Sequence, residues 1–565
     1  NDNSINPTIV PKLIASDHEC LRIPVIYDNP TSAKDTHSQR TLIYKYDLKN
    51  GNYDILNSYL LSVNWFQLFS NCKNINEKWD CFHKKVLDAI DLFVPKIKFY
   101  TNKNVKKNFV PKYIKLLINK KRNYWRLFRK TKLTFYKRKQ QALSKLIVHE
   151  SHVLKVNRIQ ALLIGKNYKK FFNLTNNFLG RKVSKDIRVK NETTADYLND
   201  KDCSNKFGEY FSSVFKTEKD YMPEFKPRSK VTDLIEDVCF NSDDIIKVIR
   251  NLKNTMSQGP DNISCFLVKK LALCIALPLS LLFQCSLHEG ILPDIWKVAC
   301  IVPIYKGKGS KEDVVNYRPI SLTSVVCKLM ESIIKQNITQ HCLKNILISS
   351  AQHGFVQGKS TVTNLIELTN DITNERDSGN NVDSICIDFA KAFDTVPHKQ
   401  LIYKLSQYGI AKFVLQWIAD FLYGRKMFVR INDYTSKMHN VTSSVPQGSV
   451  LAPLFFLLYI NDISNVIKHS KILLYADDLT LYRVVNNASD ALLLQQDLTS
   501  ISNWAKSWFL DINLSKCKVI HFGSSSFIYY INEMPVNVSA CEKILGVFVD
   551  NDLSYKTHIF AFCYG

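Results

Sequence analysis

The feature that most constrains this chain is a pair of adjacent aspartates between two apolar runs. The strand-like runs 472–475 and 479–482 flank Asp477 and Asp478. Like charges repel each other, and a tight turn between apolar strands cannot easily hide two carboxylates. A divalent cation, most often Mg²⁺, is the usual reason to hold anionic carboxylates together. The pair therefore predicts a hairpin tip that binds a metal ion.

A third carboxylate follows another predicted strand. The apolar strand 384–387 ends at Asp388. A strand that ends in an aspartate, beside a hairpin tip with two more, would gather three carboxylates at one end of a sheet. Two Mg²⁺ ions held there could activate a 3′-hydroxyl and stabilise a leaving pyrophosphate in an in-line displacement. This combination indicates a nucleotidyl transferase. Alone, the Asp477–Asp478 pair is more typical of a solvated turn, and Asp388 of a cap at a strand end.

Charge favours a polyanionic partner. Lysine and arginine number 76 against 51 acids, a net charge of +25, which predicts contact with nucleic acid or an anionic membrane. We expect no membrane partner, because the longest apolar stretch, 271–285, is short and contains Pro278. The 15 cysteines include no C-x-x-C pair, which favours reduced thiols in an intracellular protein.

Residues 101–150 are the most basic part of the chain, and Glu150 is the only acid among them. Apolar residues such as Tyr113, Leu117 and Phe128 recur at helical spacing, which predicts one amphipathic helix or a pair. We favour nucleic-acid contact over a solvated charged face, with a membrane-surface helix as the lesser alternative. The candidate contact residues are Lys120, Lys121, Arg122, Arg126, Arg129, Lys130, Lys137, Arg138 and Lys139.

Two further segments suit a nucleotide. Lys306 stands in a glycine-containing hairpin followed by Arg318, and together they offer a triphosphate a point charge and a bidentate contact. The tight turn 446–448 precedes an apolar run that is predicted to form a helix after Pro453. Such a turn can bring Gln447 against a base pair or sugar. Taken alone, it is more typical of an ordinary loop that leads into a core helix.

In their order, these segments resemble the reverse transcriptase of non-LTR (LINE-type) retrotransposons, nearest in character to jockey-like arthropod elements. The matching residues, within about 255–560, are 257–262, Lys306, 316–319, 352–355, 388–394, 446–449, 475–478, 514–516 and 545–547. The resemblance implies an α+β fold: a right-hand polymerase palm and fingers, with an antiparallel sheet packed on helices, preceded by a helical basic region. It implies RNA-directed DNA synthesis that extends a primer 3′-hydroxyl with dNTPs.

The resemblance also implies a catalytic centre. Asp388, Asp477 and Asp478 would be the catalytic carboxylates and would bind two Mg²⁺ ions, with Mn²⁺ as an alternative. Phe389 would lend a backbone carbonyl to the metal. Asp394 also matches the motif, but we expect it to have a structural role.

Five more residues would contact the nucleotide. Lys306 and Arg318 would hold the triphosphate, and Gln447 would lie beside the incoming nucleotide. Phe393 would be an aromatic gate that crowds a ribose 2′-hydroxyl, or a core phenylalanine, or both. Lys516 would give a proton to pyrophosphate, with a surface lysine as the alternative.

Near the N-terminus, Asp17 and His18 resemble the closing motif of the apurinic-type endonuclease that precedes the polymerase in these elements. The predicted domains are 1–27 (endonuclease remnant), 28–100 (linker and helical region), 101–235 (basic helical nucleic-acid-binding region), 240–545 (fingers and palm) and 546–565 (start of a truncated thumb). We expect this fragment not to cut DNA and to synthesise DNA with poor processivity.

The implied partners are an RNA template, a DNA primer and target, dNTPs, and the element RNA with its RNA-binding protein. The implied location is the nucleus during target-primed synthesis and the cytoplasm during assembly with RNA. Val356, Ala452 and Tyr555 depart from the arginine, glycine and tryptophan common in the family, and none of them is one of the carboxylates.

Two alternative functions remain open. The first is a decayed, truncated element product that retains only nucleic-acid binding. The second is an RNA-dependent RNA polymerase, which shares the palm carboxylates but is disfavoured by Phe393 and by the context of Tyr475 and Ala476.

Overall fold

The computed structural model describes residues 8–10, 20–22, 42–100, 111–165, 171–172, 187–191, 196–229, 231 and 233–564. The Asp17–His18 motif lies outside the described residues. The chain forms two compact units, one made of 1–47 and 95–174 and the other of 48–94 and 175–565. The assignment of functions to the predicted domains stays a prediction.

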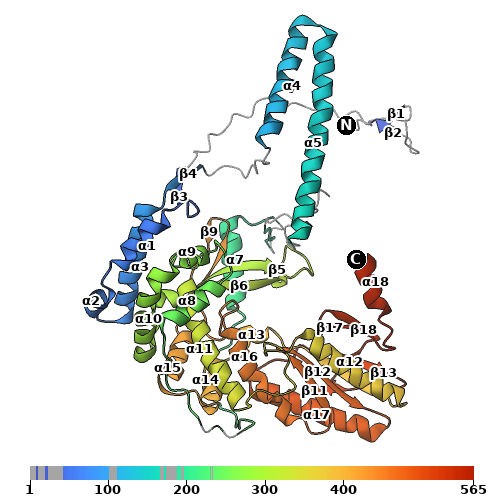
Figure 1. Ribbon diagram of the computed structural model, residues 1–565. Coiled ribbons are helices and arrows are strands. Elements are labelled where there is room, and N and C mark those ends of the chain that lie inside the picture. Colours follow the sequence, from blue (N-terminus) through green and yellow to red (C-terminus); the bar gives the residue numbers. More distant parts are fainter. Residues whose placement is uncertain are drawn as a thin grey trace. The chain divides into compact units, whose positions relative to one another are not determined.

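The first unit contains a long helical hairpin (Figure 1). Its helices are α4 (Lys112–Thr131) and α5 (Thr134–Ile164), and Lys132 between them has a left-handed φ of 58°. The basic region is thus a pair of helices. Of the two helices only Ile114 of α4 is buried, so most of their charged and apolar side chains face outward. The strands of this unit are β1 (Thr8–Val10), β2 (Cys20–Arg22), β3 (Leu42–Tyr46) and β4 (Lys96–Tyr100), which pair antiparallel as β1–β2 and β3–β4.

In the second unit, a helical layer surrounds one apolar helix, α10 (Ala272–Glu289). It packs against α1, α3, α8, α9 and α15. Among the described helices, α10 alone has the length and composition of a membrane span, and half of it is buried inside the protein. The bounds of its neighbours are α1 (Tyr53–Leu61), α3 (Ile75–Phe93), α8 (Ser242–Asn251), α9 (Cys265–Lys270) and α15 (Lys412–Leu422).

A sheet of five strands, here named the basic sheet, carries the Lys306 hairpin. Its order is β10–β8–β5–β6, with β9 paired to β8. β5 is antiparallel to β6 and parallel to β8. The bounds are β5 (Val298–Tyr305), β6 (Tyr317–Leu322), β8 (Lys426–Ile431), β9 (Tyr434–Thr435) and β10 (His439–Asn440). Helix α7 (Asp200–Ser212) packs on this sheet against β8, β9 and β10.

A second sheet of five strands, here named the carboxylate sheet, has the order β11–β12–β7–β13–β16. The central strand β7 is antiparallel to both β12 and β13. The bounds are β7 (Val382–Ile387), β11 (Lys471–Tyr475), β12 (Asp478–Val484), β13 (Lys518–Phe522) and β16 (Asn537–Val538). The predicted strand and hairpin are therefore present, and the α+β class is confirmed.

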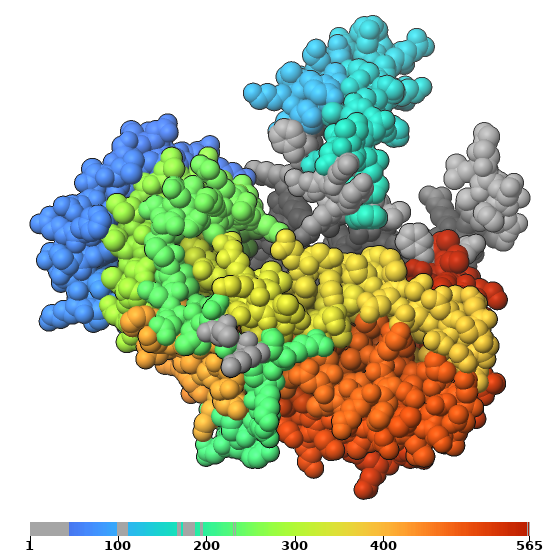
Figure 2. All heavy atoms as spheres, turned by 60° about the horizontal axis from the view of Figure 1, so that its bottom comes forward, coloured from blue at the N-terminus to red at the C-terminus, as the bar shows by residue number. Residues whose placement is uncertain are grey.

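Alternate side chains of each strand of the carboxylate sheet point to opposite faces. Both faces are covered by other parts of the unit. On β7, Ile385 and Ile387 belong to the main core, whereas Val382 packs with Leu368 and Ile372 of α12 (Thr361–Asp377). In Figure 2 the yellow atoms of the α12 segment lie directly against the orange atoms of the C-terminal half.

The other helices of this unit are α2 (Trp65–Ser70), α11 (Val325–Lys344), α13 (Ala392–Thr395), α14 (His398–Gln407), α16 (Ala452–Ile460), α17 (Ala488–Ser507) and α18 (Lys556–Tyr564). The other strands are β14 (Tyr530–Ile531), β15 (Met534–Pro535), β17 (Cys541–Ile544) and β18 (Val547–Asp550). The helix predicted after Pro453 is present as α16, which begins one residue before that proline, and eight of its nine residues are buried.

A fully buried lysine lies in the main core. Lys404 of α14 has no exposed surface, and its Nζ donates to Asp462 Oδ1 at 2.5 Å and to Tyr459 O at 2.6 Å. The ammonium lies 3.6 Å from the ring centre of Trp508 and 5.0 Å from that of Trp504. Burial lowers the pKa of Lys404 to about 8, although Asp462 opposes the shift.

We expect this lysine to make stability depend on pH. The folded chain holds its proton only up to about pH 8, whereas the unfolded chain holds it up to about 10.4. Between these values the unfolded state binds more protons, so the contribution of Lys404 to the free energy of unfolding rises with pH. Urea unfolding measures the free energy of unfolding, and from about pH 7.5 to 9.5 that of the wild type should rise relative to that of Lys404→Met. The difference between the two proteins isolates this lysine from other titrating groups, and a pH-independent difference would contradict the assignment.

Candidate active site

The three predicted carboxylates lie at one end of the carboxylate sheet. Asp388 follows β7 directly, Asp478 is the first residue of β12, and Asp477 lies in the turn before it. In the antiparallel register Leu479 pairs with Ile387, so Asp478 and Asp388 occupy the next positions along the same two strands. The hairpin and the neighbouring strand end thus bring the three side chains together.

Their charges act on one another. Loss of hydration raises the pKa of Asp477, and the nearby Asp388 raises it further, while Lys516 and Arg318 oppose the shift. Loss of hydration, followed by the like charges of Asp477 and Asp388, raises the pKa of Asp478 to about 6. A bound cation would relieve this repulsion.

A lysine makes an ion pair with one of these carboxylates. Lys516 Nζ donates to Asp388 Oδ2 at 2.9 Å. Across the described residues, no group of three His, Cys, Asp or Glu side chains is arranged as metal ligands. The donor chemistry nevertheless fits a hard divalent cation, which takes carboxylate and carbonyl oxygens. The arrangement is that of repelling carboxylates, one of which is neutralised by Lys516.

A short antiparallel bridge fixes the Asp388 end of β7. Asn513 N donates to Asp388 O at 2.8 Å, and Ala390 N donates to Asp511 O at 2.8 Å. Neither bond uses the carbonyl of Phe389, whose side chain is buried. The bridge therefore leaves unused the carbonyl that the resemblance assigns to a metal.

Cations from both sheets act on the same region. Loss of hydration lowers the pKa of Lys306, and the positive charges of Lys391, Arg318 and Lys516 lower it further, while Asp394 opposes the shift. Lys306 follows β5 and Arg318 lies on β6, so the hairpin of the basic sheet presents both of them. A polyanion such as a triphosphate would relieve the repulsion among these cations.

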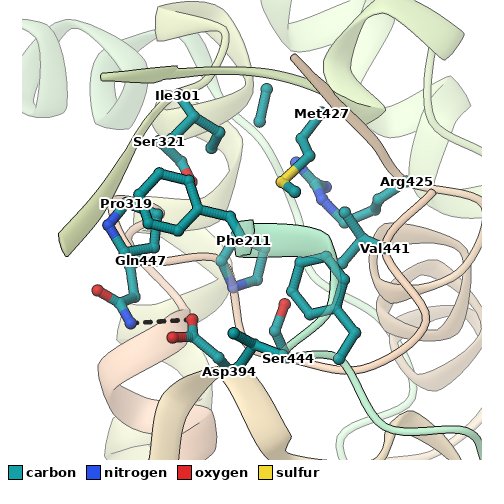
Figure 3. A pocket seen from close by; sticks show the side chains of 14 residues that line it. Phe211, Ile301, Pro319, Ser321, Asp394, Arg425, Met427, Val441, Ser444 and Gln447 are labelled. Carbon is teal, nitrogen blue, oxygen red and sulfur yellow. Dashed lines mark hydrogen bonds between the residues drawn. The ribbon is translucent and has the colours of Figure 1, made fainter. Parts of the chain in front are cut away.

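The turn that carries Gln447 is fixed from two sides. Ser321 N on β6 donates to Gln447 O at 2.8 Å, and Gln447 Nε2 donates to Asp394 Oδ1 at 2.9 Å. Figure 3 shows this amide turned toward Asp394 at the edge of a pocket that Phe211 and Met427 also line. Loss of hydration raises the pKa of Asp394 to about 6, against the hydrogen bond from Gln447. Asp394 thus holds the Gln447 amide by a hydrogen bond, and its structural role stays a prediction.

The predicted aromatic gate is part of a ring stack. Phe393 is half-buried and stacks on Phe456, with ring centres 4.4 Å apart, and the rings of Phe393 and Phe355 meet edge to face with centres 6.5 Å apart. These contacts show a ring held by the core. The gating role stays a prediction.

Sequence reasoning missed two residues of this region. Lys391 has a φ of 51° before α13 and lies 4.7 Å from the ring centre of Tyr210. Its position between two motif aspartates was an available signal. Glu331 is fully buried on α11, and its Oε2 accepts from Val450 N at 2.6 Å. The sequence pattern of α11 does not distinguish Glu331 from the other polar residues of the helix.

Charge interactions connect the carboxylates with Lys306, Arg318 and Lys516 in the second unit. In the same unit, Gln447 bonds to Asp394 and Phe393 stacks on Phe456. The candidate nucleic-acid residues lie on α4 and α5 of the first unit. Their roles stay predictions.

Comparison with known proteins shows what the second half of the chain resembles. Residues 308–549 match the family model for reverse transcriptase (RNA-dependent DNA polymerase). The chain is 32% identical over 288 residues to a probable RNA-directed DNA polymerase from transposon BS of Drosophila melanogaster, covering 48% of this chain and 31% of the relative. It is 31% identical over 330 residues to that of transposon X-element of the same species, covering 57% and 36%.

Two other matches are more distant. The RNA-directed DNA polymerase from mobile element jockey of Drosophila funebris is 28% identical over 335 residues, covering 56% of this chain and 36% of the relative. A solved telomerase from Candida tropicalis, truncated from its C-terminal domain, has 12% identity and a TM-score of 0.32, covering 46% of this chain and 54% of that one.

Residues 308–549 therefore resemble reverse transcriptases, and the assignment of the palm and fingers to the carboxylate sheet and the basic sheet stays a prediction. Its relatives are named as RNA-directed DNA polymerases of mobile elements. The chain spans 31–36% of the length of these three curated relatives.

Proposed function

We propose that this chain belongs to the RNA-directed DNA polymerase of a non-LTR retrotransposon. It would extend a primer 3′-hydroxyl with dNTPs on an RNA template. The observation that carries the proposal is the meeting of Asp388, Asp477 and Asp478 with the cations of the Lys306 hairpin. The three carboxylates lie inside the matched residues 308–549, and Lys306 lies just before them. The proposed partners are the element RNA, its RNA-binding protein and the target DNA. Synthesis would take place in the nucleus after assembly with RNA in the cytoplasm. Asp17 and His18 would be the remnant of an endonuclease.

The three carboxylates and the Phe389 carbonyl would hold divalent ions, two Mg²⁺ in the proposal, with Mn²⁺ as the alternative. When bound, such ions neutralise charge that develops on the attacking and leaving oxygens. The rigid ends of β7 and β12 keep the carboxylates in place before the nucleotide arrives, which lowers the reorganisation needed during reaction.

The cations would receive the triphosphate. Lys306 and Arg318 approach from the basic sheet, and Lys391 and Lys516 from the Asp388 side. Lys516 would exchange its ion pair with Asp388 for the leaving pyrophosphate and give it a proton. Phe393 would crowd a ribose 2′-hydroxyl, while Gln447, held by Asp394, would contact the nucleotide.

A primer-extension assay tests the function directly. The chain is mixed with a DNA primer annealed to RNA, Mg²⁺, and either dNTPs or rNTPs. Template-dependent extension with dNTPs is the expected result. Extension with rNTPs alone would instead indicate an RNA-dependent RNA polymerase. Binding of the primer–template without extension would favour a decayed product that retains only nucleic-acid affinity.

The α4–α5 hairpin favours RNA binding as a part of this function. Its helices expose many cations next to aromatic rings, as where Lys137 lies 5.8 Å from the ring centre of Phe128. Cations would contact phosphates and exposed rings would stack on bases.

Replacing Arg122, Arg126 and Arg129 by glutamine should weaken RNA binding and make it less sensitive to salt. For single strands the slope of log K against log salt should become less negative by roughly 0.7 for each lost phosphate contact. Glu150→Gln removes the only acid of the region and should strengthen binding under the same titration. Equal slopes for wild type and the triple variant would contradict the contact.

A further inference from the structure

The segment Gln352–Gly354 lies alongside the strand that leads into the carboxylate turn. His353 N donates to Leu474 O at 2.8 Å, and Leu474 N donates to Ala351 O at 2.9 Å. These bonds form a parallel bridge between Gln352 and Leu474 of β11. The segment therefore acts as a short additional edge of the carboxylate sheet, next to the turn that carries Asp477.

The side chain of Gln352 reaches the turn itself. It is fully buried, and its Oε1 accepts from Gly354 N at 2.7 Å and from Ala476 N at 3.2 Å. Both partners are backbone N–H donors, so the oxygen and not the nitrogen must face them. Gln352 Nε2 has no hydrogen-bond partner among the described residues. The two backbone N–H groups that Gln352 Oε1 accepts from therefore fix the orientation of its side-chain amide.

The turn needs such an acceptor. Ala476 is buried and has a φ of 56°, a left-handed conformation that is unfavourable for a residue with a Cβ. Without Gln352 its buried N–H would lose its partner, which costs about 1–3 kcal/mol. The backbone also approaches closely here, because a Cβ at Gly354 would lie 2.3 Å from Ala476 N.

Helix α12 holds the segment from the other side. His353 is almost fully buried, with Nδ1 2.9 Å from Thr363 Oγ1 and Nε2 3.2 Å from Glu367 Oε2. Asn364 Nδ2 donates to Leu474 O at 3.3 Å. Gln352 is therefore mounted on a strand edge that is itself tied to a helix, which suits a rigid support.

We propose that Gln352 is a positioning residue that holds the Ala476 amide and so sets the direction of the Asp477 and Asp478 carboxylates. Gly354 makes the close approach possible. The inference rests on the proposed function only in that these carboxylates catalyse the reaction. The contact between Gln352 and the turn can be tested without activity.

The kinetic test compares Gln352→Leu with Gln352→Glu. Leucine removes the acceptor at similar volume, and we expect kcat for dNTP incorporation to fall on the order of 10–100-fold, with KM for dNTP within about twofold. Glutamate keeps an acceptor oxygen but replaces the unpartnered nitrogen by a second carboxylate oxygen, which adds negative charge near Asp477 and Asp478, so it should recover part of kcat. A rise in KM with unchanged kcat, or no recovery by glutamate, would overturn the role.

The matched control is Gln400→Leu. Gln400 of α14 is also a fully buried glutamine. Its Nε2 donates to Lys219 O and to Tyr221 O, both at 3.0 Å. Its loss should lower stability but leave kcat near the wild-type value. An equal loss of kcat in Gln400→Leu and Gln352→Leu would show a general effect of destabilisation and overturn the proposal.

Hydrogen exchange decides the contact independently of catalysis. The amides of 474–478 should exchange on the order of tenfold faster in Gln352→Leu, and as in the wild type in Gln352→Glu and Gln400→Leu. Unchanged exchange in Gln352→Leu would overturn the proposal. A wild type that incorporates no nucleotide would refute the proposed function, while this exchange pattern would still decide whether Gln352 holds the turn.

Discussion

Asparagine at Asp388 or at Asp477 is expected to reduce dNTP incorporation on the order of 10³-fold or more while leaving the fold intact. Each change removes one negative charge from the group that would bind the metal, and loss of a preorganised electrostatic group has effects of this size. The measurement is the single-turnover rate of primer extension at saturating Mg²⁺. A residual rate within about tenfold of the wild type would refute the assignment of these carboxylates.

Stability should respond in the opposite direction. The charge of Asp388 raises the pKa of both Asp477 and Asp478, so these groups repel one another in the folded state. Replacing Asp477 by neutral asparagine relieves that repulsion, and the free energy of unfolding should stay level or rise. A protein that loses activity without losing stability separates a catalytic role from a structural one.

Asp371→Asn provides the matched control. Asp371 on α12 is ion-paired with Lys471 at 2.7 Å and is 23% exposed, close to the 26% of Asp388 beside Lys516. It also accepts from Tyr482 Oη at 2.8 Å. This variant removes a carboxylate of similar exposure that is also paired with a lysine and is not one of the three carboxylates. It should lower stability slightly and leave the rate near that of the wild type.

The carboxylate end of the sheet could be predicted because its signal is local. Apolar runs mark the strands, and the aspartates beside the ends of these runs are therefore expected at strand ends. The register that brings Asp478 beside Asp388 follows once β7 and β12 are neighbours. Local patterns of this kind also predicted the hairpin of Lys306 and the helix after the 446–448 turn.

Contacts between distant segments could not be predicted in the same way. Gln352 and Ala476 are separated by 124 positions, and a buried glutamine has no periodicity that names its partner. Glu331 looks like one more position of an amphipathic helix, yet it accepts from the backbone after the Gln447 turn. The long-range packing decides these contacts, and only the folded chain shows them.

The second large effect is expected from Gly448→Ala. Gly448 has a φ of +123°, and a Cβ there would lie 2.4 Å from the backbone oxygen of Ser321. The residue after Gln447 would thus be both strained and blocked by backbone that cannot move aside as a flexible side chain can. The turn must shift, and with it the bonds from Ser321 N to Gln447 O and from Gln447 Nε2 to Asp394.

Misplacing Gln447 in this way should lower kcat/KM for dNTP on the order of 100-fold, as expected when a positioning group is displaced by about 1 Å. Gly379→Ala separates the two causes, because Gly379 has a φ of +81° and nothing within 4 Å of the added Cβ. That variant should cost about 1–2 kcal/mol of stability with kcat/KM unchanged. If both variants lowered kcat/KM equally, backbone strain alone would explain the loss, and the close packing of the Gln447 turn on β6 would have no part in placing the nucleotide.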